Sequence, residues 1–477
     1  MGATGPGRSW PALAGIAVLT LTGCGRDLTP QVSVQIQQLT AAAPVSPVSK
    51  AVWADVQRFY AQRMHAPRWL HDGEEQQIEA ALRAVHQAPE HGLMAADYGD
   101  AALPRRLESK QSVEDSLGED VARIARLDLQ ITTALLALGR DVAVGRTNPA
   151  ALDKRWKAAR PVPDLAASLA AAADAGRVDG WLDSVRPLHP EYAALQAALA
   201  SVRKQLGHGA AGDERVHRLA LNLERWRWLP DDLGARHVLV NIPSFQMAVR
   251  ESGRPVLEMK VVVGTLERVT PVFSARMDTI VFSPYWNVPD SIAVDETAPA
   301  AAHDPRFLAR NNIEILHRGE DGVGVVNPAS VDWDDPDAIK ALTFRQKPGP
   351  DNALGQVKFL FPNPYDVYLH DTPADALFAR TGRAFSHGCV RLEKPEALAS
   401  YLLRADPEWD DARIQAAMHQ GEERHVAMKE KMPVHTVYFT AWPDGAGGVR
   451  TFADAYGYDA RQSRTPATSA IARAKLD

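Results

Sequence analysis

The hexapeptide Ser386-His387-Gly388-Cys389-Val390-Arg391 contains one of only two cysteines in the 477-residue chain. Apolar residues precede and follow it, which predicts a tight turn between two short buried strands. Gly388 suits such a turn because it has no side chain to obstruct the backbone. A thiol attacks as the thiolate, but a free cysteine with a pKa of about 8.5 is mostly protonated at neutral pH. Nucleophilic chemistry at Cys389 therefore requires a base nearby.

A second histidine, His370, follows the apolar run Val367-Tyr368-Leu369, and fifteen residues separate it from the hexapeptide. We predict that its imidazole takes the thiol proton, as in other pairs of nucleophile and base. The peptide carbonyl of Asp371 could orient the ring, and the backbone N–H groups of Gly388 and Cys389 could bind an oxyanion. These roles predict acyl transfer through a thioester. The alternative is a structural thiol, since a lone cysteine is most often a small buried apolar residue.

Together with three other segments, this pattern resembles the L,D-transpeptidases, enzymes that cross-link or trim peptidoglycan. The segments are NLERWRWLP at 222–230, SPYWNVP at 283–289 and YLHDTP at 368–373. The resemblance is to the large two-part members found in Gram-negative envelopes, and it covers roughly residues 50–460. It implies an α+β fold, in which a helical scaffold domain precedes a mixed, sandwich-like β catalytic domain.

The resemblance also implies the roles of single residues in catalysis. Cys389 is expected to be the nucleophile and His370 its base, with the imidazole oriented by the backbone carbonyl of Asp371. His387 and Gly388 are expected to line the oxyanion pocket together with Cys389.

Four further residues are expected to contact the substrate: Ser386, Arg391, Tyr368 and Trp286. Ser386 would also shape the oxyanion pocket. Many family members have asparagine where this chain has Arg391, and the forked guanidinium could bind a carboxylate of the substrate. The two aromatic residues, like Phe385, are candidates for the wall of the cleft, with a place in the core as the alternative.

Composition places the chain among globular proteins, with 45% hydrophobic and 23% charged residues. Its length suffices for two or three domains with their own cores. The net charge of −6 argues against nucleic-acid binding, which needs a basic surface. The sequence has no phosphate-binding glycine loop, dinucleotide-binding motif, zinc-binding His-Glu-x-x-His or serine-type penicillin-binding motif. We therefore expect neither a metal nor another cofactor.

The amino-terminal residues predict export and a lipid anchor. An apolar run over 12–21 is too short to span a bilayer, and Leu21-Thr22-Gly23-Cys24 resembles a bacterial lipobox. On this interpretation residues 1–23 are a signal peptide, Cys24 is lipidated, and the protein faces the periplasm. Gly25 favours the outer membrane. The alternative is an ordinary signal peptide, or an uncleaved anchor, with an incidental cysteine.

The rest of the chain divides by composition and by the period of its apolar residues. The expected parts are a flexible tether (24–49), the helical scaffold domain (50–206), a linker (207–217), the catalytic domain (218–460) with a cap inserted at about 290–353, and a frayed tail (461–477). The linker leaves no room for the small peptidoglycan-binding module that large family members often carry. Strands are predicted over 237–242, 246–250, 257–263, 279–282, 434–440 and 449–458.

The resemblance predicts that Cys389 attacks a tetrapeptide stem between diaminopimelate and D-alanine, and that the amine of a second stem resolves the thioester. The product is a diaminopimelate–diaminopimelate cross-link. Carbapenems are expected to acylate the same thiol. Within the family the alternatives are carboxypeptidase activity, exchange of D-amino acids, or attachment and release of a lipoprotein. A peptidoglycan-binding scaffold without catalysis is an alternative of another class.

Overall fold

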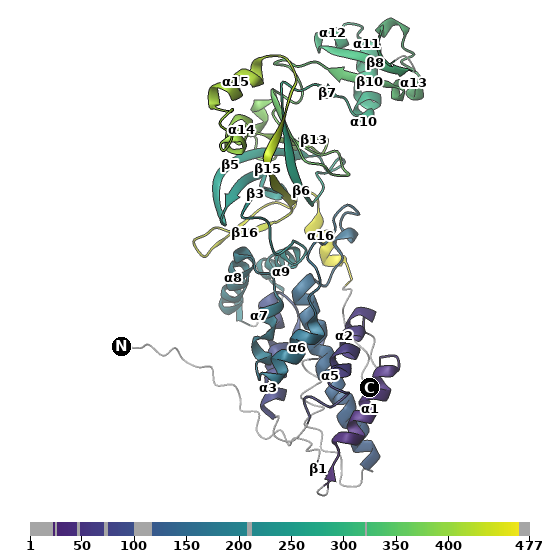
Figure 1. The fold of residues 1–477 in the computed structure, drawn as a ribbon, viewed down its shortest axis with the longest axis vertical. Helices are drawn as coiled ribbons and strands as arrows, with labels where there is room; N and C mark the ends of the chain where they lie inside the picture. The colour runs from purple at the N-terminus through teal and green to yellow at the C-terminus, as the bar shows by residue number, and fades with distance from the viewer. Residues whose placement is uncertain are drawn as a thin grey trace, which may run out of the picture. The chain divides into compact units, whose positions relative to one another are not determined.

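The computed structural model describes residues 22–23, 26–44, 48–70, 75–99, 117–207, 212–319 and 322–466. The chain divides into two compact units (Figure 1). The helical unit comprises residues 1–231, 440–451 and 458–477, and the β unit comprises 232–439 and 452–457. The expected α+β class, a helical region followed by a β-rich catalytic region, is confirmed.

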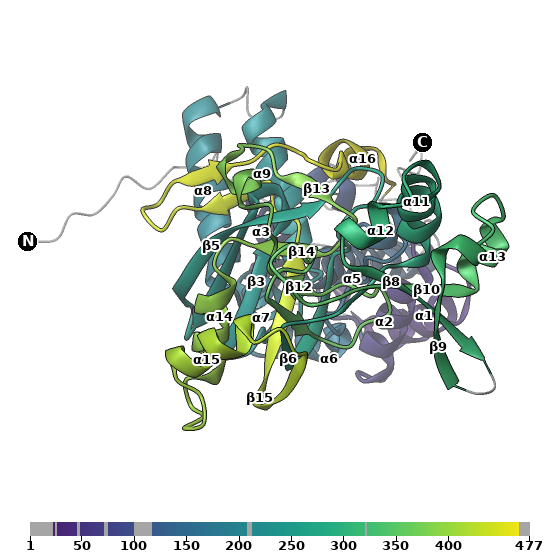
Figure 2. The ribbon, with the colours of Figure 1, turned by 90° about the horizontal axis from the view of Figure 1, so that it is seen from above.

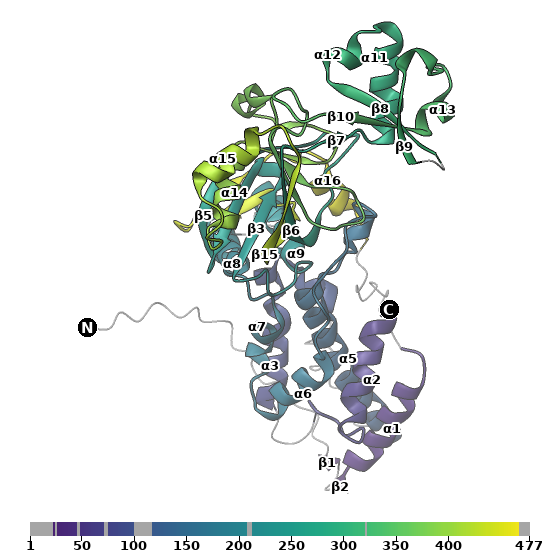
Figure 3. The same cartoon turned by 45° about the horizontal axis from the view of Figure 1, so that its top comes forward.

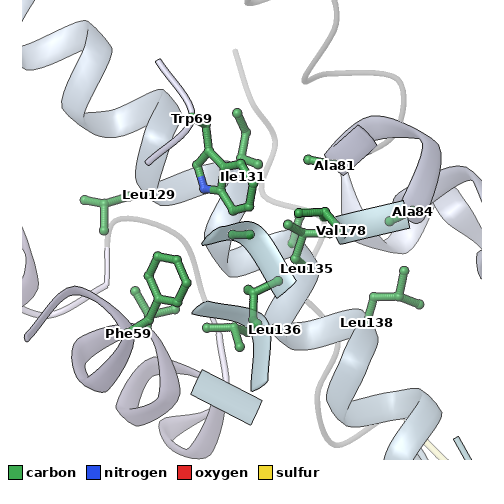
Figure 4. Packing of buried hydrophobic residues seen from close by; sticks show 14 of the residues in the cluster. Phe59, Trp69, Ala81, Ala84, Leu129, Ile131, Leu135, Leu136, Leu138 and Val178 are labelled. Carbon is green, nitrogen blue, oxygen red and sulfur yellow. The ribbon is translucent and has the colours of Figure 1, made fainter. Parts of the chain in front are cut away.

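The helical unit is built around α5 (Leu117–Val144), a helix of 28 residues. Figure 4 shows Leu135, Leu136 and Leu138 of α5 pointing into a core that also contains Phe59 and Trp69. Its other helices include α1 (Thr29–Ala41), α2 (Lys50–Ala61), α3 (Glu75–His86), α6 (Leu165–Asp174), α7 (Trp181–Val185), α8 (Pro190–Leu206) and α9 (Glu214–Trp226). Apolar residues of α1, α2, α3, α6 and α7 belong to this core, as the helical spacing of apolar residues predicted. The buried residues of α8 and α9 lie outside this cluster.

The prediction of a flexible tether over 24–49 is wrong for residues 29–41, which form α1. Pro30 is accommodated in the first turn, where its missing N–H is not needed. Val32, Ile36 and Thr40 recur every four residues and are buried. Because this face packs against α2 and α5, the segment belongs to the folded body in spite of its Thr- and Gln-rich composition.

A buried carboxylate, Asp128 on α5, holds the loop that follows α2. Its oxygens accept hydrogen bonds from three successive backbone N–H groups, those of Arg68 (3.0 Å), Trp69 (2.7 Å) and Leu70 (3.2 Å). The Tyr60 hydroxyl donates a fourth at 2.6 Å. Burial raises the pKa of Asp128, while these donors favour its charged form. The side chain therefore supplies the acceptors that this loop cannot find in a helix or a sheet.

The β unit contains a nine-stranded mixed sheet in the order β13-β5-β14-β12-β11-β6-β15-β3-β4 (Figure 2). The strands are β3 (Arg236–Asn241), β4 (Gln246–Glu251), β5 (Arg254–Gly264), β6 (Phe273–Phe282), β11 (Val357–Leu360), β12 (Leu369–His370), β13 (Ala384–Ser386), β14 (Val390–Leu392) and β15 (Arg424–Val437). Pairing of β4 with β5 closes the sheet on itself. The β domain that was expected to be sandwich-like is therefore a single sheet closed on itself.

The segment predicted as a cap forms a small lobe with its own sheet and core (Figure 3). Its strands are β7 (Trp286–Asn287), β8 (Ile313–Gly319), β9 (Gly322–Val326) and β10 (Leu342–Gln346), and its helices are α10 (Asp290–Ile292), η7 (Ala293–Thr297), α11 (Ala298–His303), α12 (Phe307–Arg310) and α13 (Pro336–Lys340). Ile292, Ile315 and Phe344 are among the buried residues of its core. Because this segment is rich in polar residues, the sequence analysis did not predict that it has a core of its own.

The carboxyl-terminal expectations need two corrections. The strand predicted over 449–458 ends early, because β17 (Val449–Thr451) pairs only with β16 (Ala441–Pro443). The tail predicted to fray from 461 instead continues α16 (Tyr458–Arg464), in which Gln462 is buried and accepts a hydrogen bond from Arg225. Both segments belong to the helical unit, and the first division between units falls after residue 231 instead of 217.

Most of the predicted signal peptide and the predicted lipidation site, Cys24, lie outside the described residues. Near them β1 (Thr22–Gly23) pairs with β2 (Arg26–Asp27). Within the described part of the chain, every helix is too short or too polar to cross a bilayer. After the cap the chain forms two further helices, α14 (Pro395–Leu403) and α15 (Asp411–His419).

Candidate active site

The candidate nucleophile lies on the turn between β13 and β14. Gly388 in this turn has φ +118°, a conformation that side-chain-bearing residues rarely adopt. Ser386 ties the turn together, because its hydroxyl donates to the carbonyl of Cys389 and accepts from the N–H of Gly388 at 3.1 Å. The Thr270 hydroxyl donates to the Gly388 carbonyl at 2.8 Å. These bonds fix the backbone on both sides of the thiol.

The same bonds change the expected oxyanion pocket. Gly388 was predicted to offer its N–H, but that group is already bound to Ser386. The N–H of Cys389 makes no hydrogen bond with the part of the chain that the structure describes, so it is the donor open to a substrate. Ser386 is itself buried, and it therefore positions the turn instead of contacting substrate.

The candidate base ends β12, the strand beside β14 (Figure 2). His370 Nδ1 lies 2.5 Å from the carbonyl oxygen of Asp371. A carbonyl only accepts, so Nδ1 carries the proton and the lone pair is left on Nε2. Asp371 is fixed in turn, because its carboxylate accepts from the N–H groups of Gln356 and Thr372, each at 2.7 Å. The predicted orienting role of the Asp371 carbonyl agrees with this geometry.

Register places the reacting side chains on one face of the sheet. The strands β12 and β14 run parallel, with His370 opposite Arg391 and Leu369 opposite Val390. Side chains alternate along a strand, so Cys389 and Arg391 share the face on which His370 and Tyr368 lie. The rings of Tyr368 and His370 are 5.6 Å apart, centroid to centroid. Thiol, imidazole, phenol and guanidinium therefore lie on one face of the sheet, where the thiol donates to the carbonyl oxygen of Asp366 with Sγ 3.7 Å away.

Burial sets the charge state of the pair. It raises the pKa of the Cys389 thiol to about 11, although Tyr368 and Arg391 act in the opposite direction. Burial, with the positive charge of Arg391, lowers the pKa of His370 to about 3. At pH 7 the resting pair is a neutral thiol beside a neutral imidazole. The imidazole is thus free to accept the thiol proton during attack, which is general-base catalysis.

Two family models match the chain, a scaffold domain over residues 54–199 and an L,D-transpeptidase catalytic domain over 235–412. Residues 235–412 are an L,D-transpeptidase catalytic domain. The resemblance inferred from the hexapeptide and its flanking segments is confirmed. The L,D-transpeptidase domain contains both His370 and Cys389, and it spans β3 to the beginning of α15.

A putative L,D-transpeptidase of Haemophilus influenzae is 36% identical over 244 residues, which is 51% of this chain and 48% of that protein. The chain thus matches about half the length of this relative. Among solved structures, LdtMt1 in complex with imipenem is 15% identical, with coverage of 43% of this chain and 59% of the other and a TM-score of 0.20. L,D-transpeptidase 3 from Mycobacterium tuberculosis is 16% identical, with coverage of 42% and 60% and the same TM-score.

Two aromatic residues of the L,D-transpeptidase domain come from different segments near the thiol. Tyr368 interacts electrostatically with Cys389 and also with Trp286, and burial together with Cys389 raises the pKa of the phenol. Trp286 belongs to β7, which pairs with β10 of the cap. Phe385, by contrast, is 38% exposed and stacks under Arg380 instead of joining the core. Tyr368 therefore lies beside Cys389, and Trp286 adjoins Tyr368; their contact with substrate stays a prediction.

His387 points toward the cap of the L,D-transpeptidase domain. Its Nε2 lies 2.6 Å from the Glu296 carboxylate on η7. Arg268 donates to the same carboxylate at 3.1 Å and to the carboxylate of Asp295 at 3.0 Å. These partners lower the pKa of Glu296, against the effect of its partial burial. The sequence analysis missed Glu296 and Arg268, because nothing in their local sequence marks them and they lie 91 and 119 residues before His387.

Replacing Arg391 by glutamine should raise the pKa of both Cys389 and His370, because its positive charge favours thiolate and disfavours imidazolium. Alkylation of Cys389 by iodoacetamide at pH 8 should slow by about tenfold for each unit of pKa increase. The measurement is the rate of alkylation between pH 6 and pH 11. Arg391→Lys keeps the charge and should retain the wild-type profile; an unchanged profile in the glutamine variant would show that Arg391 does not act on the thiol.

Proposed function

We propose that the protein is a peptidoglycan L,D-transpeptidase that joins two stem peptides through a thioester on Cys389. The observation that carries the proposal is the pairing of β12 with β14, which puts His370 opposite Arg391, two residues after Cys389. The membership of residues 235–412 in the catalytic family supports the same reaction.

In the first step, Cys389 Sγ attacks the carbonyl between diaminopimelate and the terminal D-alanine, and His370 Nε2 takes the thiol proton. The N–H of Cys389 stabilises the oxyanion. The carbon–nitrogen bond breaks, the proton passes from His370 to the amine of D-alanine, and a thioester remains. In the second step the amine of another stem attacks the thioester, His370 takes its proton and returns it to the sulfur. No metal or cofactor is needed to balance these steps.

Arg391 is the proposed contact for a carboxylate of the stem. Its Nε is buried, and it makes no hydrogen bond to the described part of the chain. A buried donor without an acceptor is costly, and a substrate carboxylate would satisfy it. The position of Arg391 directly beside His370 would place the bound carboxylate near the reacting carbonyl.

The test is the intact mass of the protein after incubation with a carbapenem, wild type beside Cys389→Ala, followed by analysis of the muropeptides formed from purified sacculi. One adduct in the wild type alone, with diaminopimelate–diaminopimelate dimers among the products, would support the proposal. An adduct with only shortened stems would assign carboxypeptidase activity instead. Absence of an adduct would indicate that Cys389 is a structural cysteine and would contradict the proposal.

The ion pair between His387 and Glu296 should contribute little to the chemistry. Their side chains are 35% and 51% exposed, and such pairs contribute about 0–1 kcal/mol. Glu296→Gln should therefore change the rate of acylation by less than about fivefold, while hydrogen exchange in residues 293–303 becomes faster. Single-turnover acylation and exchange measured by mass spectrometry test this expectation. A loss above a hundredfold would show that Glu296 takes part in the reaction itself.

We also propose that Cys24 is lipidated and tethers the enzyme to the outer membrane, with its catalytic domain in the periplasm. The support is the sequence Leu21-Thr22-Gly23-Cys24 after an apolar run. Labelling of cells with a fatty-acid probe should mark the wild type and not Cys24→Ala. Equal labelling of both proteins would refute the anchor.

A further inference from the structure

A cavity of about 390 Å³ lies within the helical unit, apart from the catalytic residues. Its lining comes from the segment 92–97, the residues after α5, and the helices α8, α9 and α16. Small-molecule sites in proteins have volumes of about 300–1,000 Å³. Nothing in the proposed reaction uses this cavity.

One part of the lining is a network of paired charges. Glu224 accepts hydrogen bonds from the N–H of Arg146 (2.6 Å) and of Thr147 (2.8 Å), and its second oxygen accepts from Arg227 at 2.7 Å. The guanidinium of Arg146 binds Asp97 at 2.9 Å. These groups satisfy one another, so this wall is polar but already neutralised.

A third arginine of the lining, Arg203 near the end of α8, differs from these two in having no ion-pair partner among the described residues, although the Nε of Arg227 also lacks an acceptor there. The Nε of Arg203 is buried and finds no acceptor in the described chain. Burial lowers the pKa of the Arg203 guanidinium, and no carboxylate acts in the opposite direction. The charged side chains of the lining are thus two carboxylates and three guanidiniums, which leaves one positive charge uncompensated inside the cavity.

The remaining lining has small and apolar side chains. Leu93, Val216, Ala220 and Leu221 contribute to it, and Met94 at the same cavity is 56% exposed. A ligand that fits must combine one negative charge with a compact, partly apolar body.

We propose that this cavity binds a small carboxylate ligand whose charge pairs with Arg203. A guanidinium binds a carboxylate through two parallel hydrogen bonds, which would satisfy the buried Nε. Polyanions are disfavoured because Asp97 and Glu224 line the same cavity. The carboxylate could be the end of a peptidoglycan stem peptide, a source that rests on the proposed function, or a free small acid such as a D-amino-acid derivative.

The experiment titrates the full-length Cys389→Ala protein with N-acetyl-D-alanine by calorimetry, beside the matched amide, N-acetyl-D-alaninamide. We expect binding of the acid only, weakened by at least tenfold in Arg203→Gln and by less than about threefold in Arg203→Lys. Affinity should fall with added salt, because the contact is between opposite charges. A second arm uses the tetrapeptide stem; tighter binding of the stem than of the short acid would identify a peptide as the ligand.

Equal binding of acid and amide, or no binding of either probe, would overturn the proposal. The proposal would also be overturned if Arg203→Gln bound N-acetyl-D-alanine with unchanged affinity while Arg391→Gln lost binding. The probe would then occupy the catalytic face. An unchanged melting temperature of Arg203→Gln shows that the variant is folded. Acylation of Cys389 by a carbapenem in this variant should equal the wild type, so failure of this site and failure of the transpeptidase proposal give different results.

Discussion

Replacing His370 by alanine should slow acylation of Cys389 by about 10²–10⁴-fold, the usual contribution of a general base. The thiol pKa of about 11 leaves little thiolate at pH 7, so the reaction depends on a group that removes the proton during attack. The loss should shrink as the pH rises, because thiolate then forms without help. The wild-type rate should stay nearly level down to about pH 4, since the imidazole becomes charged only near its pKa of about 3.

Rapid-quench kinetics of carbapenem acylation between pH 4 and pH 10 measure this effect. His387→Ala is the matched control, because this histidine adjoins the same turn but faces Glu296. The His387→Ala substitution should reduce the acylation rate far less than His370→Ala. An alanine variant of His370 that reacts at the wild-type rate at pH 7 would exclude the imidazole as the base and point to Tyr368, which interacts electrostatically with the thiol.

Replacing Asp128 by alanine should destabilise the helical unit by about 3–5 kcal/mol, which would be among the largest effects of a single substitution. The change leaves the N–H groups of Arg68, Trp69 and Leu70 without an acceptor in a buried loop. It also removes one of the two partners of the buried Tyr60 hydroxyl, which keeps its contact with Thr132. Each unsatisfied buried donor costs about 1–3 kcal/mol, and partial relaxation reduces the sum.

Urea unfolding followed by tryptophan fluorescence and circular dichroism tests the prediction. Asp128→Asn keeps one carbonyl oxygen in the same place and should lose less stability than the alanine variant. The loop it holds carries Trp69, which stacks on Phe59 with ring centroids 6.4 Å apart, so early loosening should alter the fluorescence. A loss below 1 kcal/mol in Asp128→Ala would show that water replaces the carboxylate.

The catalytic motif could be predicted because its information is local. Gly388, the thiol and the two neighbouring strands are specified within a few residues, and His370 ends its own apolar run. The roles of Ser386 and Gly388 were less predictable. Whether an N–H of the turn is open to a substrate depends on the rotamer of one hydroxyl, and in this turn Ser386 occupies the N–H of Gly388.

The contacts across the cap could not be predicted, for a different reason. The partner of His387, Glu296, lies on η7, and Arg268, which binds the same carboxylate, lies before β6; each is one charged residue in a polar segment. Composition also led to a wrong prediction near the amino terminus, where α1 was expected to be part of a flexible tether. A helix such as α1 buries only three residues, and their spacing of four is a weak signal among Thr, Gln and Ser, until α2 and α5 supply a surface to pack against.

The chain passes between the helical and β units at four points along its length, after residues 231, 439, 451 and 457. The helical unit therefore lacks its hairpin β16–β17 and α16 until synthesis has passed residue 464. Arg225, buried in α9, must wait for Asp459 of α16, its partner at 2.7 Å. The helical unit, although it begins the chain, is therefore completed after the β unit. Removal of residues 440–464 would leave the helical unit without β16, β17 and α16.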